Sequence, residues 1–176
     1  LQKDCADKIL KSEISVDPTR SPFIIGRLEV LLESDDFQDV IDFSKGLKST
    51  GTYRVHCLNN QDFGRTLKIP HSKRRKLERE LGMNILGEPD LHNPEVHFGV
   101  LQYNDNWYFG IYEKSEQVWL QHVEKPNQFS TALNTKVARA VMNILAPFPE
   151  GKRYIDPCCG IGTVVIEGLS MGIDII

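Results

Sequence analysis

The chain has 176 residues, of which 40% are hydrophobic and 26% are charged, and its net charge is −3. This length suffices for one domain of ordinary size, or for one domain and part of another, and the composition excludes a chain that is disordered throughout. The near-neutral balance excludes a uniformly basic nucleic-acid-binding chain, so any surface for nucleic acid has to be local.

The cysteines, histidines and hydropathy indicate in which compartment the protein works and whether it binds metal. The four cysteines include no Cys-x-x-Cys pair, and the five histidines lack metal-ligand spacing, which disfavours a disulfide framework and a zinc site. No apolar run approaches the roughly 20 residues that a membrane-spanning helix needs. We therefore expect a cytoplasmic protein without bound metal and without a membrane partner.

The first half of the chain alternates strand-like and helix-like segments. Helices are predicted at 3–11, 35–46 and 73–81, strands at 23–32 and 52–58, a turn at 17–22 and a loop at 59–70. Ser34 is the expected N-cap of the second helix, and Gly46 is its expected stop. Apolar, alternating runs at 96–103 and 107–112 flank Asn104-Asp105-Asn106, which predicts a hairpin.

The aromatic residues of this hairpin are more typical of a sheet core than of a surface that stacks bases. Residues 118–120 predict one more short strand. A break at 125–130 predicts a linker, and a helix is expected over 131–145. Apolar residues recur on one face of this helix: Leu133, Val137, Val141, Ile144 and Leu145.

A locally basic segment lies between residues 65 and 79, where Glu78 is the only acid. Its seven cations could neutralise phosphates in a sequence-independent, salt-sensitive manner, although charge runs are often ordinary solvated surface. The candidate RNA-binding residues are Arg65, Lys68, Lys73, Arg74, Arg75, Lys76 and Arg79.

The most specific pattern is a strand, a tight glycine turn and a helix over 154–171. Gly160 and Gly162 permit a tight turn and close approach of a ligand, and the following helix directs free amides at it. Val165 stands where the dinucleotide fingerprint needs its third glycine, and no P-loop lysine follows. The pattern therefore disfavours nicotinamide and P-loop nucleotide binding.

Residues 156–163, Asp-Pro-Cys-Cys-Gly-Ile-Gly-Thr, resemble the first motif of Rossmann-type RNA methyltransferases that use S-adenosylmethionine. The family is the one that pairs a THUMP domain with a guanine-N2-type methyltransferase. Residues 130–133, 137–141 and Asn143 are similar to the helix before that motif, and residues 26–113, with Asp-Leu-His-Asn-Pro at 90–94, are similar to a THUMP domain.

This resemblance implies a fold, a cofactor and a partner. The fold is an α+β THUMP-like RNA-binding domain over 1–124, a linker over 125–130, and the first elements of an α/β Rossmann-like methyltransferase domain over 131–176. The partner is RNA, in particular tRNA. The residues that the resemblance assigns to S-adenosylmethionine binding are Thr131, Asp156, Pro157, Cys158, Gly160, Gly162 and Thr163.

The family's acidic ribose-binding residue and its Asn/Asp-Pro-Pro-aromatic motif are not found in this sequence, so catalytic residues are expected beyond Ile176 and the fragment alone is expected to be inactive. The implied reaction is methyl transfer to a base amine, in particular guanine N2. A non-catalytic RNA-binding module and a DNA amine methyltransferase stay as alternatives. We also expect self-association, because Val164, Val165, Ile173, Ile175 and Ile176 would lack partners in a truncated sheet.

Overall fold

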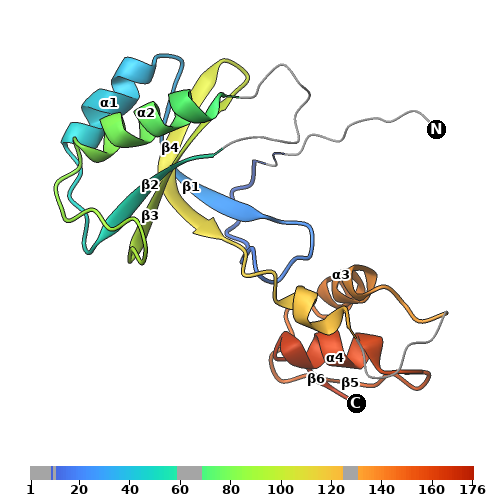
Figure 1. Ribbon diagram of the computed structural model, residues 1–176. Coiled ribbons are helices and arrows are strands. Elements are labelled where there is room, and N and C mark those ends of the chain that lie inside the picture. Colours follow the sequence, from blue (N-terminus) through green and yellow to red (C-terminus); the bar gives the residue numbers. More distant parts are fainter. Residues whose placement is uncertain (1–8, 10, 59–68, 125–130) are drawn as a thin grey trace, which may run out of the picture. The chain divides into compact units, whose positions relative to one another are not determined.

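The computed structural model describes residues 9, 11–58, 69–124 and 131–176 (Figure 1). The chain divides into two compact units. The first comprises residues 1–15 and 28–113, and the second comprises residues 16–27 and 114–176. Most of the helix predicted at 3–11 and most of the loop predicted at 59–70 lie outside the described residues.

The first unit is a mixed α/β layer structure, with a four-stranded sheet in the order β1-β4-β3-β2. Strands β2 and β3 are parallel, and β3 and β4 form the predicted antiparallel hairpin. Helices α1 and α2 lie on one face of this sheet (Figure 1). In chain order the elements are β1 (Gly26–Ser34), α1 (Phe37–Lys45), β2 (Tyr53–Cys57), α2 (His71–Gly82), β3 (Val96–Tyr103) and β4 (Asn106–Lys114).

Short polar signals set the element boundaries in this unit. The N-cap of α1 is Asp36, whose carboxylate accepts from the Gln38 amide at 2.9 Å, and not the predicted Ser34. The Ser34 hydroxyl instead accepts from the Asp36 amide at 3.1 Å. Asn104 and Asp105 both have positive φ, as a tight two-residue hairpin turn requires.

The core of the first unit forms between the sheet and the two helices. Alternate residues of β2 are buried, and they pack with Leu77 and Leu81 of α2. The Phe98 and Phe109 rings stack with centroids 5.8 Å apart, and Trp107 is buried beside them. The prediction that the hairpin aromatics belong to the core is therefore confirmed for these residues.

The second unit contains a β-α-β element with its own core. Parallel strands β5 and β6 flank α4, and the core gathers Met142, Ala146, Ile173 and Ile175. Ile173 and Ile175 are buried, so the prediction that they lack partners is wrong. The elements are the 3₁₀ helix η2 (Val118–His122), α3 (Thr135–Leu145), β5 (Arg153–Tyr154), α4 (Thr163–Ser170) and β6 (Asp174–Ile175).

Two elements of the second unit differ from their predictions. Residues 118–120 belong to the 3₁₀ helix η2, in which the Leu120 amide donates to the Gln117 carbonyl, and not to a strand. Helix α3 begins at Thr135, because the Asn134 side chain caps the Lys136 amide. The apolar residues that share one face of α3 are exposed, and its buried residues are Thr135, Ala138, Arg139 and Met142.

The second compact unit includes two segments that precede α3 in the chain. Residues 16–27 and 114–124 belong to the second unit because their backbone is bonded to α3 and to each other. The boundaries at 1–124, 125–130 and 131–176 follow a family resemblance and stay predictions for functional domains. None of the helices in the described part of the chain is long and apolar enough to cross a membrane.

Candidate functional site

The predicted glycine turn lies between β5 and α4. Asp156 extends the pairing beyond β5, since its amide donates to the Ile176 carbonyl at 2.7 Å. Its carboxylate then accepts from the Cys158 amide at 3.1 Å, and the Gly162 amide donates to the Cys159 carbonyl at 2.8 Å. These bonds close a compact turn at the carboxyl end of β5, the edge at which open α/β sheets bind ligands.

The two glycines are needed for backbone conformation and leave open space beside the turn. Gly160 has φ +54° and Gly162 has φ +77°, in the left-handed region that side chains other than glycine rarely adopt. A Cβ atom at either position would meet no atom within 4 Å. Gly162 is the N-cap of α4 and provides no side-chain cap, so the first amides of the helix can serve a polar ligand.

The other predicted cofactor residues lie in different settings. Pro157 and Cys158 are exposed on the turn, whereas Thr163 is buried at the start of α4. Thr131 is exposed, four residues before α3, and no hydrogen bond joins it to the glycine turn in the part of the chain that the structure describes. The structure therefore brings the residues over 156–163 together, and the role of Thr131 stays a prediction.

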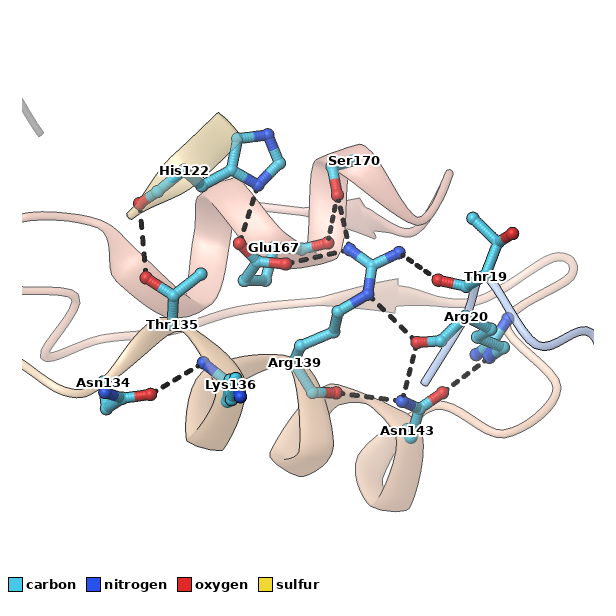
Figure 2. A network of polar contacts seen from close by, with 10 residues as sticks. All are labelled: Thr19, Arg20, His122, Asn134, Thr135, Lys136, Arg139, Asn143, Glu167 and Ser170. Atoms are coloured by element: carbon cyan, nitrogen blue, oxygen red, sulfur yellow. Dashed lines mark hydrogen bonds and ion pairs between the residues drawn. The ribbon is translucent and has the colours of Figure 1, made fainter. Parts of the chain in front are cut away.

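A buried ion pair lies one helical turn after the glycine turn (Figure 2). Glu167 is fully buried, and its carboxylate binds Arg139 Nη1 at 2.8 Å and His122 Nδ1 at 2.7 Å. Arg139 is 2% exposed and also donates to Ser170 Oγ. A glutamate in the helix after such a turn is typical of a surface or salt-bridge residue, and here Glu167 forms a buried salt bridge.

The same arginine binds backbone oxygen atoms of the segment that precedes β1. Arg139 Nε donates to the Arg20 carbonyl at 3.0 Å, and Nη2 donates to the Thr19 carbonyl at 3.1 Å. Asn143, one turn further along α3, donates to the Arg20 carbonyl at 3.1 Å and accepts from Arg20 Nε at 2.8 Å (Figure 2). No sequence signal joins these residues, since more than 100 positions separate them.

A shallow concavity of about 640 Å³ in the second unit lies away from the glycine turn. Its lining includes Arg20, Lys152 and Arg153. Arg153 and Asp174, which also line it, are the first residues of the parallel strands β5 and β6. The glycine turn follows the carboxyl end of β5, so the two features occupy opposite ends of the β5–β6 pair. No group of three or more metal-ligating side chains occurs among the described residues.

Helix α2 carries the described part of the basic segment. Lys73, Arg75, Lys76 and Arg79 are exposed along it, whereas Leu77 and Leu81 face the core. Arg74 is half-buried, and its Nε has no hydrogen-bond partner among the residues that the structure describes. Arg65 and Lys68 lie outside the described residues.

The single acid within the basic segment is turned toward the sheet. The Glu78 carboxylate accepts a hydrogen bond from the Cys57 amide of β2 at 2.9 Å, so this carboxylate binds inside the unit. Burial, followed by the Glu78 charge, raises the pKa of the Cys57 thiol to about 11. Four cations and one acid, Glu80, are exposed on α2, and burial makes Cys57 a structural residue rather than a reactive one.

Comparisons with known proteins match both parts of the chain. A family model described as RMKL-like, methyltransferase domain, matches residues 124–176. A curated tRNA (guanine(10)-N2)-dimethyltransferase of Methanothermobacter thermautotrophicus is 24% identical over 146 residues, which cover 81% of this chain and 41% of that protein.

Solved structures are similar over different shares of the chain. TrmN from Thermus thermophilus aligns with a TM-score of 0.47 and 16% identity, over 93% of this chain and 50% of that chain. A 4-thiouridine synthetase, solved as an RNA complex with bound ATP, aligns with a TM-score of 0.38 and 19% identity, over 60% of this chain and 30% of that chain. The chain thus spans about two fifths of the curated relative and half of TrmN.

Proposed function

We propose that this chain, a THUMP-type methyltransferase-like protein related to the tRNA guanine-N2 methyltransferases, binds tRNA and provides one side of an S-adenosylmethionine site. The whole protein would transfer a methyl group to a base amine, and guanine N2 is the amine that we propose. The observation that carries this proposal is the open glycine turn between β5 and α4, within the segment that the methyltransferase family model matches.

The residues of the turn fit S-adenosylmethionine. The cofactor carries an ammonium and a carboxylate at its methionine end. Asp156 can accept from the ammonium, and the uncapped first amides of α4 can donate to the carboxylate. The space beside Gly160 and Gly162 lets the cofactor approach the backbone closely.

When bound, the cofactor supplies an electrophilic methyl group on a sulfonium. The chain's own contribution is positioning: the turn fixes the methionine end, so that the methyl group can face an incoming amine in line. Access to a base inside an RNA helix requires that the base leave its stack. The proposal assigns no catalytic residue to these 176 residues.

The RNA side of the proposal rests on the exposed cations of α2. They lie on one helix on which Glu78 is turned inward and Glu80 is the exposed acid, so the helix surface is locally positive in a chain of net charge −3. Contacts of this kind bind phosphates without reading sequence, and they release counterions. The name of the curated relative supports tRNA as the RNA species.

Salt-dependent binding of a tRNA transcript tests the RNA side. The triple variant Lys73→Gln, Arg75→Gln and Lys76→Gln removes three exposed charges and should reduce the slope of log K against log salt by up to about 2–3. Lys45→Gln, an exposed lysine on α1 paired with Asp42, is the matched control and should leave the slope unchanged. An unchanged slope in the triple variant would show that α2 is ordinary surface.

The cofactor side needs a separate measurement. Titration of S-adenosylhomocysteine into the chain, followed by amide chemical shifts, should perturb the Gly160 and Gly162 signals first. Shifts at these amides should be absent with NADH, which the glycine spacing disfavours. Binding of NADH at the turn, or ligand-induced shifts confined to the concavity near Lys152, would contradict the proposal.

A further inference from the structure

Two segments connect the second unit to the sheet of the first. Residues 16–27 run into β1 and residues 114–122 follow β4, and we call them the connecting segments. They are bonded to each other within the second unit. The Ser115 amide donates to the Ile25 carbonyl at 2.9 Å, and the Glu116 amide donates to Thr19 Oγ1 at 3.2 Å.

Arg139 and Glu167 fasten both connecting segments to α3 and α4 (Figure 2). Arg139 holds the first segment through the Thr19 and Arg20 carbonyls, while its Nη1 binds Glu167. Glu167 reaches the second segment through His122, and the His122 carbonyl accepts from the Thr135 hydroxyl of α3 at 3.2 Å. The buried Arg139–Glu167 pair thus joins four parts of the unit, which are α3, α4 and the two connecting segments.

Burying the Arg139–Glu167 pair adds little to the stability of the unit. A buried ion pair loses solvation that its attraction barely repays, and well-packed apolar residues of similar volume are often at least as stable. An apolar pair, however, could not bind two backbone carbonyls in a fixed direction. The fork of a guanidinium does so, because its donors are rigid and planar.

Glu167 also lies on α4, one turn after the glycine turn that begins at Gly162. We infer that Arg139 is a positioning residue, which holds the connecting segments against the helix that bears the cofactor turn. The cofactor part of this inference rests on the proposed function, whereas the holding of the segments does not.

Arg139→Lys separates positioning from simple core stability. Lysine keeps a positive charge for Glu167, but its single ammonium cannot also serve the Thr19 and Arg20 carbonyls in the geometry of the fork. Loss of even one hydrogen bond to a charged donor should open the segments, and we expect amide exchange at Ser115 and Glu116 to accelerate about tenfold or more.

Two references make this exchange measurement decisive. Arg153→Lys alters an exposed arginine, paired with Asp174 in the same unit, and should leave both rates unchanged. The Ala146 amide, bonded to Met142 at the end of α3, reports general loosening of the unit. If Arg139→Lys leaves Ser115 and Glu116 at wild-type rates, or accelerates Ala146 by the same factor, the positioning role is refuted.

Discussion

Neutralising Glu167 should destabilise the second unit far more than neutralising an exposed acid of the same unit. In Glu167→Gln, the guanidinium of Arg139 would stay buried without its counter-ion. Removing one partner of a buried pair costs about 3–5 kcal/mol. Such a loss is a large part of the 5–15 kcal/mol that typically stabilises a domain, and it should lower Tm by roughly 12 °C or more in a unit of this size.

The matched control is Asp174→Asn. Asp174 pairs with Arg153 at the same distance, 2.8 Å, but the two side chains are 52% and 68% exposed. Solvent screens this pair, so its loss should cost less than about 1 kcal/mol. The contrast between two ion pairs of equal length isolates the contribution of burial.

Urea unfolding followed by tryptophan fluorescence measures the difference. The sequence has two tryptophans, and a Trp107→Phe background leaves Trp119, buried in the second unit, as the reporter. Glu167→Gln should lower the transition midpoint at an unchanged m-value. A double variant, Arg139→Met with Glu167→Met, should regain stability, because no charge is then left unpaired. Equal midpoints for Glu167→Gln and Asp174→Asn would refute the reasoning.

Three further outcomes follow from single positions. Cys57 has a pKa of about 11 against an ordinary 9.0, so it should resist alkylation at pH 8 while the exposed Cys158 reacts. The stabilisation that the protonated Cys57 thiol contributes should be full below pH 9 and lost between pH 9 and 11. Gly162→Ala should cost about 1–2 kcal/mol in urea unfolding through its φ of +77° alone, since a Cβ there meets no atom. Met142→Ala should cost about 2–5 kcal/mol and its exposed neighbour Val141→Ala about 0.5 kcal/mol, and a reversed order would contradict the observed face of α3.

The sequence predicts correctly the elements whose structure depends on residues that are close together in the chain. The hairpin at Asn104-Asp105, the strand over 53–57 and the glycine turn each depend on residues close in sequence, and all three are found near their predicted places. The boundary of α3 was displaced because Asn134 competes as an N-cap within the predicted helix. Residues 118–120 belong to a 3₁₀ helix and not to the predicted strand, because so short an apolar run fits either structure.

Which helix faces are buried, and which side chains form the ion pair, depends on tertiary packing and is not visible in the pattern of a single segment. The spacing of Val137, Val141 and Ile144 identified an apolar face of α3 correctly, but periodicity does not say which face meets the neighbouring elements. The opposite face is buried, because Arg139 reaches across to α4. In the same way, Glu167 resembles a surface residue on its own helix and becomes a core residue only beside Arg139 and His122.

Helix α4 begins beside open space and is held by buried contacts in its middle. Its first turn follows Gly162, which has no side chain to cap it, and beside which a Cβ would find open space. One turn later, Glu167 is held from two sides by α3 and η2. A binding loop that must accept a ligand has to leave polar groups unsatisfied, and such groups recognise the ligand well only when their support is rigid. The buried pair provides this support, which is why we place a positioning residue on α3 and not on the turn itself.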